Sequence, residues 1–214
     1  MRLEFQKKGP LQVLCLGAHS DDIEIGCGGT VLRLLDENPR LEFYWMVFSS
    51  TPQRKREARK SAQLFLNKTP ASRVVFKNFR DGYFPFQGAR IKDCFELLKK
   101  SFVPDLIFTH SRDDLHQDHR LICNLTWNTF RSHLILEYEI PKYDGDFGSP
   151  NLFVGLPESL CKQKMQYVLR CFKSQLSKQW FTEDTFRATL RLRGIESNAQ
   201  ENNAEGFYCR KLYL

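Results

Sequence analysis

The sequence lacks the features that would place the protein in a membrane, in a secretory pathway or among thiolate metal sites. No apolar stretch of its 214 residues approaches the roughly 20 residues that cross a bilayer. The N-terminus has no continuous apolar core of a signal peptide. The seven cysteines form no C-x-x-C pair, which argues against thiolate zinc. We therefore expect free thiols, a cytoplasmic location and no stable membrane insertion.

The sequence also lacks a nucleic-acid-binding signature, although its formal net charge is +7. The densest basic stretch is "QRKREARK" at 53–60. Such a run usually forms the solvated face of a helix, and no RNA-binding or helix-turn-helix motif accompanies it. We predict no nucleic-acid partner, while an anionic small substrate is compatible with the charge.

Short apolar runs alternate with amphipathic segments along the first two thirds of the chain. This alternation predicts βαβ units and a mostly parallel sheet. The expected strands are 11–18, 41–49, 73–79, 104–110 and 133–140, and the expected helices are 28–38, 51–67, 89–102, 118–131, 157–173 and 182–193. A terminal extended segment is expected over 206–214.

The fold class that follows is a Rossmann-like, three-layer α/β/α arrangement with a C-terminal elaboration. The composition, 42% hydrophobic and 27% charged, is that of a globular protein. No linker, repeat or low-complexity segment divides the chain. We predict one domain over 1–214, with the Rossmann-like part at about 10–140 and the elaboration at about 141–214.

Two clusters of histidine and carboxylate residues follow predicted strands. They are "LGAHSDDIEIGCGG" at 16–29 and "HSRDDLHQDHR" at 110–120. In open parallel sheets ligands bind at the carboxyl ends of the strands. We therefore expect the two clusters to meet at one edge of the sheet, although they are far apart in sequence.

These residue types suit a divalent metal ion with one open coordination position. Imidazole and carboxylate together favour zinc. His19 and Asp22 can reach one ion, and His119 would complete the set. Asp21 is then free to accept a proton from water at the ion.

Two further residues of the second cluster are candidates for the chemistry. His116 is three residues before His119, so both side chains can face one cavity. Asp118 lies between them and could orient an imidazole. By contrast, we expect His110 to make a structural hydrogen bond, and Asp81 to lie in a turn that could border the pocket.

The first cluster resembles the A-H-P-D-D-x-E signature of the PIG-L/LmbE family of zinc-dependent N-deacetylases, and "LHQDHR" resembles that family's H-P-D-H motif. Ser20 and Gln117 replace the prolines of the two motifs. The resemblance implies that the ligands are His19, Asp22 and His119. It also implies a basic role for Asp21, and for His116 an oxyanion-stabilising or acid role with support from Asp118. Zinc is the expected cofactor, with another divalent ion such as Fe²⁺ as an alternative.

Further residues are assigned to substrate binding through weaker resemblance. "RKREARK" resembles the family's R-x-x-E helix, which implies that Arg56 or Glu57 lies near the pocket. "RLRGIES" with "AEGFY" resembles a family segment that borders the substrate, which implies Arg191 and Arg193.

The reaction implied is removal of an acetyl group from an N-acetylated amino sugar or its conjugate, nucleotide- or lipid-linked forms included. Two alternatives stay open: a Rossmann-like nucleotide-dependent transferase and a non-catalytic binding relative. The "GCGG" segment lacks the G-x-G-x-x-G spacing of a dinucleotide fingerprint, so we predict no nucleotide cofactor. A homo-oligomer is compatible with the resemblance.

Overall fold

The structure is a computed structural model that describes residues 10–38, 40–69 and 72–212. Its centre is a seven-stranded sheet with the strand order β3-β2-β1-β4-β5-β7-β6. The first five strands of this order are parallel, and β7 runs antiparallel to both of its neighbours. The strands are β1 (Gln12–Gly17), β2 (Glu42–Val47), β3 (Arg73–Phe76), β4 (Leu106–His110), β5 (Leu134–Tyr138), β6 (Leu152–Gly155) and β7 (Ala204–Cys209).

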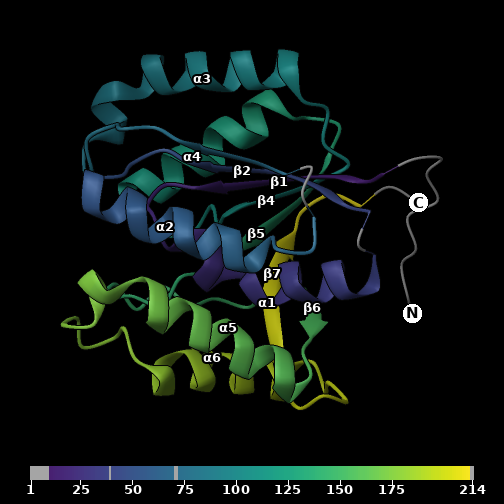
Figure 1. The fold of residues 1–214 in the computed structure, drawn as a ribbon. Helices are drawn as coiled ribbons and strands as arrows, with labels where there is room; N and C mark the ends of the chain where they lie inside the picture. The colour runs from purple at the N-terminus through teal and green to yellow at the C-terminus, as the bar shows by residue number, and fades with distance from the viewer. Residues whose placement is uncertain (1–9, 39, 70–71, 213–214) are drawn as a thin grey trace.

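Helices cover both faces of this sheet, as Figure 1 shows. α3 (Gly88–Ser101) and α4 (Gln117–Thr129) lie above it in that view, with α1 (Asp22–Glu37), α2 (Pro52–Phe65), α5 (Glu158–Cys171) and α6 (Glu183–Glu196) on the other side. Two short 3₁₀ helices, η1 (Phe84–Gln87) and η2 (Lys173–Gln175), precede α3 and follow α5. The predicted three-layer α/β/α fold is confirmed.

The two hydrophobic clusters follow from the alternation of side chains along buried strands. In β1, Val13 and Cys15 join the cluster on the side of α1, α2, α5 and α6, whereas Leu14 and Leu16 join the cluster under α3 and α4. All four side chains are at most 1% exposed. A strand buried on both faces reads as a continuous apolar run, which is why this strand was predictable.

The start of α1 differs from the prediction. The helix begins at Asp22, six residues before the expected start at 28, so the acidic cluster occupies its first turn. The prediction was wrong because glycines were interpreted as loop residues. A Cβ at Gly26 would lie 2.1 Å from the Tyr138 ring, and one at Gly28 would lie 2.7 Å from the Phe65 ring. These glycines therefore serve close helix packing.

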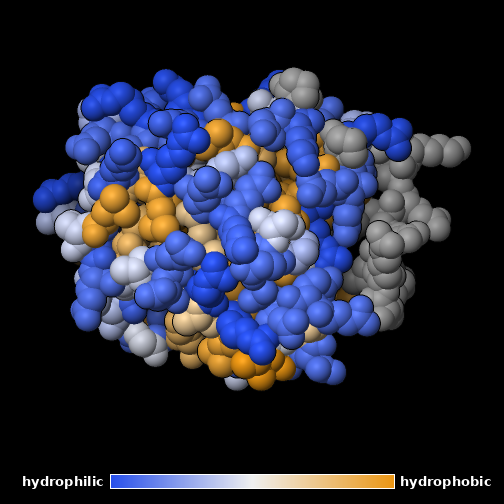
Figure 2. Space-filling view, turned by 60° about the horizontal axis from the view of Figure 1, so that its bottom comes forward, coloured by the Kyte–Doolittle hydropathy of each residue, from blue (hydrophilic) through white to orange (hydrophobic). Residues whose placement is uncertain are grey.

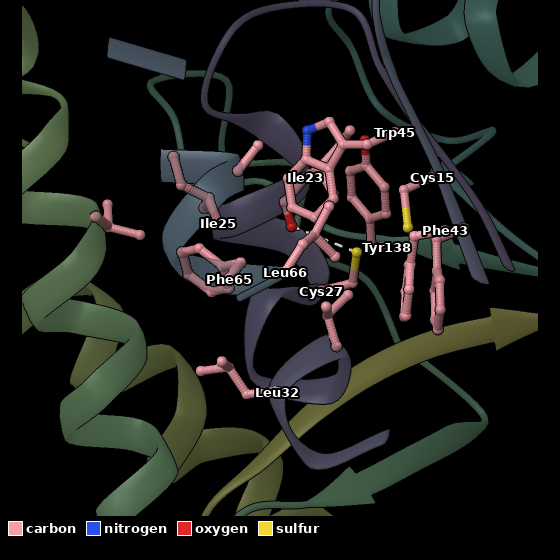
Figure 3. Packing of buried hydrophobic residues seen from close by; sticks show 14 of the residues in the cluster. Cys15, Ile23, Ile25, Cys27, Leu32, Phe43, Trp45, Phe65, Leu66 and Tyr138 are labelled. Carbon is pink, nitrogen blue, oxygen red and sulfur yellow. Dashed lines mark hydrogen bonds between the residues drawn. The ribbon is translucent and has the colours of Figure 1, made fainter. Parts of the chain in front are cut away.

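Figure 3 shows the core that holds this helix in place. Ile23 and Cys27 of α1 lie beside Trp45 of β2 and Tyr138 of β5, and the Cys27 thiol donates a hydrogen bond to the Ile23 carbonyl at 3.3 Å. The Tyr138 hydroxyl donates to the carbonyl of Leu16 at 2.6 Å. The helix that carries the first cluster is thus fixed against the centre of the sheet. All seven cysteines are free thiols, as predicted.

A buried carboxylate is one of the groups that join the C-terminal part to the Rossmann-like part. Glu205 of β7 accepts hydrogen bonds from the backbone N–H groups of Gly29 and Thr30 at 2.8 and 2.7 Å. It also pairs with the ammonium of Lys164 on α5 at 2.6 Å. A buried ion pair is tolerated when further hydrogen bonds satisfy it. This network connects β7, α1 and α5. β6 was not predicted, and β7 confirms the expected terminal extended segment in part.

Polar residues dominate the face drawn in Figure 2, with apolar groups at its left and along its lower edge. Among the exposed large hydrophobic side chains of the C-terminal part are Leu176, Leu192 and Ile195. Within the described ranges, none of the helices has both the length and the apolar composition that spanning a membrane requires.

Candidate metal centre and active site

The two sequence clusters meet at the carboxyl ends of adjacent strands. β1 and β4 are paired in parallel, and they end next to each other toward the left of Figure 1. A cavity of about 430 Å³ opens there. We call its residues from the two clusters and the nearby turn the floor: His19, Ser20, Asp21, Asp22, Asp81, His116 and His119. Residues that follow β5 and α5 form what we call the wall: Lys142, Tyr143, Asp144, Gln175, Lys178 and Trp180.

Local backbone structure positions the carboxylates of the first cluster. Asp21 occupies the N-cap position of α1, and its carbonyl accepts from the N–H of Ile25 at 3.0 Å. Asp22 is the first helical residue, and its Oδ2 accepts from the backbone N–H of His19 at 2.6 Å. Asp21 Oδ1 faces Arg54 instead, so the two neighbouring carboxylates point to different partners.

Three donor atoms of the floor form a triangle of the size that a metal ion needs. His19 Nδ1 lies 3.5 Å from Asp22 Oδ2 and 3.1 Å from His119 Nε2, and the last two atoms are 3.6 Å apart. Tetrahedral ligands about 2.0–2.1 Å from zinc are separated by roughly 3.3 Å. The donor set predicted from the sequence therefore fits a small divalent cation.

Each imidazole of this triangle turns its other nitrogen to a carboxylate. His119 Nδ1 lies 2.9 Å from Asp114 Oδ2. His19 Nε2 lies 3.0 Å from Asp81 Oδ1 and 3.3 Å from Asp118 Oδ2. Carboxylates in these positions set the tautomer of a ligating histidine and increase its basicity. Asp114 was not among the sequence predictions.

The role of Asp118 differs from the expectation that it supports His116. Its carboxylate accepts from the backbone N–H groups of Gly82 and Phe84 at 2.7 and 3.1 Å, and its Oδ2 faces His19. Only its backbone N–H reaches His116, donating to Nδ1 at 3.2 Å. The reason is geometric, because His116 is the N-cap of α4 while Asp118 points from the first turn toward the loop before η1.

The protonation states of Asp22 and His119 match those of a metal site, and the pKa of His19 reflects the carboxylates around it. Burial opposes ionisation of Asp22, but three facing imidazoles, led by that of His119, hold its pKa well below the usual range. Burial, reinforced by His110, lowers the pKa of His119 to about 3. Burial also acts to lower the pKa of His19, yet Asp22 and Asp118 raise it well above the usual value. The site thus combines an ionised carboxylate and a neutral imidazole with surroundings that favour positive charge.

Other groups of neighbouring ligand atoms overlap this triangle. His110 with Asp22 and His119, and His116 with His19 and His119, each have ligand atoms within 4.8 Å of one another. His110 Nε2, however, accepts a hydrogen bond from the N–H of Ala18 at 2.9 Å. That lone pair is therefore in use, which agrees with the predicted structural role of His110.

Asp21 is held by an arginine that the sequence analysis did not assign. Arg54 Nη2 lies 2.5 Å from Asp21 Oδ1, and Arg54 also lines the cavity. Burial raises the pKa of Asp21, although the Arg54 charge opposes this. The R-x-x-E spacing is met by Arg54 and Glu57, so this pairing was the signal that would have identified Arg54.

His116 completes the floor. Its ring centroid lies 4.9 Å from that of His19 and 4.5 Å from that of His119. Burial, and after it the neighbouring His19, lower the pKa of His116. A proton on this ring would therefore be given up readily.

The residues expected to border the substrate divide into two groups. Asp81 lines the cavity, as expected. Arg56 is exposed on α2 and does not line the cavity, because residues two apart on a helix point to different sides and it is Arg54 that points inward. Arg191 donates to the carbonyl of Asn202 at 2.7 Å. Arg193 is buried and pairs with Glu139 at 2.7 Å, so it stabilises the packing of the C-terminal part.

Comparison with known proteins gives a family match and several structural ones. The family model described as PIG-L, GlcNAc-PI de-N-acetylase, matches residues 14–130. A conserved protein of Thermus thermophilus has a similar structure, with 21% identity, TM-score 0.73 and coverage of 95% of this chain and 97% of that one. An N,N'-diacetylchitobiose deacetylase of Pyrococcus horikoshii in complex with an inhibitor has 23% identity, TM-score 0.71 and coverage of 92% and 82%.

A third similar structure has a different activity. It is the 4-carboxy-2-hydroxymuconate hydratase of Pseudomonas putida, with 15% identity, TM-score 0.72 and coverage of 95% of this chain and 98% of that one. At these identities the structural matches show a shared fold. The reaction has to be argued from the site.

Proposed function

The chain belongs to the PIG-L family, and from this premise we propose that it is a metal-dependent hydrolase that removes the acetyl group from an N-acetylated amino sugar or its conjugate. The observation that carries the proposal is the triangle of His19, Asp22 and His119, with Asp21 directly beside it. The Pyrococcus horikoshii relative is a deacetylase of an acetylated sugar, which supports the same substrate class here.

His19, Asp22 and His119 would hold the ion, and zinc is our assignment because two imidazoles and one carboxylate suit it, with iron(II) as the alternative. When bound, such an ion lowers the pKa of water from about 16 toward 7 and polarises a carbonyl oxygen. Asp114, Asp81 and Asp118 would orient the two imidazoles.

Asp21 would take the proton of the attacking water. Its Oδ1 is held by Arg54, so Oδ2 is the oxygen available for proton transfer. Burial raises the pKa of Asp21, which makes its carboxylate a stronger base. The new C–O bond forms at the acetyl carbon as this proton leaves the water.

His116 would act on the tetrahedral intermediate and on the leaving amine. In its protonated form the ring stabilises the oxyanion that develops on the acetyl oxygen. It then gives its proton to the amide nitrogen, the C–N bond breaks, and an amine and acetate are released. The lowered pKa of His116 makes the protonated ring an effective acid.

The nucleotide-dependent alternative finds no support in the glycine-rich segment. A pyrophosphate would have to approach the backbone of residues 26–29 closely. Protein side chains already fill that space: a Cβ at Gly29 would lie 2.4 Å from Leu156, and the corresponding contacts at Gly26 and Gly28 are with aromatic rings.

The test is elemental analysis of purified protein, paired with His19→Ala. We expect about one zinc or iron per chain in the wild type and its loss in the variant. His133→Ala is the matched control, because His133 lies outside the cavity and should keep the metal. His116→Ala should also keep it, which separates the His19, Asp22 and His119 set from the overlapping one. The loaded enzyme is then assayed for acetate release from N-acetylated sugars.

Two results would overturn the proposal. Metal absent from the wild type even after zinc is supplied would remove the hydrolase mechanism. Metal retained in full by His19→Ala would show that the ion is held elsewhere.

A further inference from the structure

The cations of the cavity are not equivalent. Arg54 is engaged by Asp21 at 2.5 Å and by Glu57 at 3.6 Å. Lys142 lies 3.0 Å from Asp114 and also pairs with Asp146. Each of these two charges is therefore balanced by protein carboxylates. Neither has a charge to spare for a substrate anion.

Lys178 is the exception among the described cavity residues. Its ammonium makes no ion pair within the described part of the chain, and its contact is with the Trp180 ring, 5.6 Å from the centroid. An ammonium has three donors to satisfy. An exposed lysine at a cavity wall can satisfy them with water or with an anionic ligand.

The backbone around Lys178 is well connected, which fixes the point at which its side chain leaves the chain at the cavity wall. The N–H of Lys178 donates to the Gln175 carbonyl at 2.9 Å, and its carbonyl accepts from Phe181 at 3.0 Å. The segment is joined to α2 through Ser174, whose N–H and hydroxyl donate to Glu57 at 2.9 and 2.6 Å.

A second source of positive potential faces the same cavity. The N-terminus of α2 opens into it through Ser50 and Thr51. The first turn of this 14-residue helix contains no acidic residue. The positive end of the helix dipole is therefore not offset locally, and it adds to the field of Lys178.

Most acidic residues of the cavity belong to the floor, and the Lys178 charge acts on one of them, Asp21, without forming an ion pair with it. Asp21, Asp22 and Asp81 belong to the floor, where Arg54 and His19 face them. The wall has one carboxylate among its described residues, Asp144, and it is exposed on the loop after β5, where solvent screens it.

We propose that Lys178 and Trp180 form a subsite for a phosphate group carried by the amino-sugar substrate. The ammonium of Lys178 contacts the phosphate, and the Trp180 ring packs against the sugar or its substituent. This inference rests on the proposed function, and it narrows the substrate class to N-acetylated amino sugars with a phosphate monoester or diester.

The test compares substrates that differ in this group. The metal-loaded enzyme is assayed with N-acetylglucosamine 1-phosphate, with its methyl phosphodiester, N-acetylglucosamine 1-(methyl phosphate), as the diester, and with the neutral methyl N-acetylglucosaminide. We expect kcat/KM to be about tenfold higher for at least one phosphorylated substrate, the size of one exposed charge-assisted hydrogen bond. Which phosphorylated substrate is preferred distinguishes a monoester from a diester. The preference should decrease as potassium chloride is added.

Lys178→Met should reduce the ratio to about one, and Lys178→Arg should retain part of it. Lys173→Met is the matched control, since Lys173 is exposed on the same segment and does not line the cavity; it should keep the full preference. Equal rates on charged and neutral substrates in the wild type would overturn the subsite. An undiminished preference in Lys178→Met would overturn it as well.

A binding measurement keeps the two proposals separable. The dissociation constants of N-acetylglucosamine 1-phosphate and the methyl glycoside are measured by calorimetry for the wild type and Lys178→Met. If no substrate releases acetate, the proposed function fails, and a preference for the phosphate that disappears in Lys178→Met still supports the subsite. If acetate is released but binding shows no such preference, the subsite fails alone.

Discussion

The floor and the wall of the cavity differ in how their side chains are held. In the floor, Asp22 and His119 are 4% and 3% exposed, and the charged groups face partners within about 3.6 Å. In the wall, Asp114 and Asp146 hold Lys142, but Tyr143 is 71% exposed, and Lys178 makes no ion pair within the described residues. The family match over residues 14–130 contains the floor and ends before the wall.

The difference teaches where chemistry and selectivity reside. A hydrolytic site needs groups fixed to a fraction of an ångström, which the paired strands and helix starts of the floor supply. Selectivity needs contacts that can change without disturbing that geometry, and loops at the surface supply them. We therefore expect substitutions in the floor to act on kcat and substitutions in the wall to act on KM.

The largest effect is expected for Asp21→Asn. The amide cannot accept the proton from water, so kcat should fall by about 10²–10⁴, while the metal content measured by elemental analysis stays at the wild-type level. Asp113→Asn, an exposed carboxylate of the second cluster, is the control and should keep its rate. Full activity in Asp21→Asn would show that the base is a different residue.

A smaller effect is expected for Trp180→Ala in the wall. Loss of the ring should raise KM for an N-acetylated sugar by about threefold to tenfold, the size of an aromatic packing contact, with kcat within about twofold of the wild type. Phe86→Ala removes an exposed ring outside the cavity and serves as control. A large drop in kcat with unchanged KM would abolish the distinction between floor and wall.

A separate effect, on stability rather than on rate, is expected beneath the floor. Burial, followed by the nearby Asp21 and Asp22 charges, raises the pKa of Glu24 to about 8. Below its unfolded pKa, near 4.3, Glu24 is neutral in both states. As the pH rises toward 8 the unfolded chain releases this proton while the folded protein retains it, so stability falls.

Glu24→Gln cannot ionise and should escape this loss. In the metal-free protein, the melting temperature of Glu24→Gln should rise relative to that of the wild type by on the order of 10 °C between about pH 4.5 and 8. The gap between the folded and unfolded pKa values corresponds to about 5 kcal/mol, and each kcal/mol is worth roughly 2–4 °C at this size. Thermal melts in chelator-containing buffers measure the difference. Glu37→Gln, exposed on the same helix, is the control. A difference that is constant with pH would show that Glu24 ionises normally in the fold.

Much of the floor could be predicted because its residues are close together in sequence. His19, Asp21 and Asp22 follow one buried strand, and His116 and His119 follow another, so the rule that parallel strands end at one edge was sufficient to bring them together. The helix start at Asp22 could not be predicted from glycine content. The glycines fit against Tyr138, Phe65 and Leu156, which lie far along the chain.

The wall and the supporting charges depended on contacts between distant segments. Arg54 and Arg56 look alike in a basic run, and only the orientation of α2 shows that Arg54 reaches Asp21. Arg193 was predicted near the substrate, but the packing of α6 places it against Glu139.

The sequence by itself determined the parallel α/β class, the donor residues and the reaction type that they favour, because strand periodicity and two short motifs are local properties. The tertiary structure alone decided that Asp118 faces His19, that Arg54 holds Asp21, and that Lys178 is left without a carboxylate partner in the described chain. The physical reason is that the partners and the pKa of a charged side chain depend on the groups around it, and folding brings those groups from other parts of the chain.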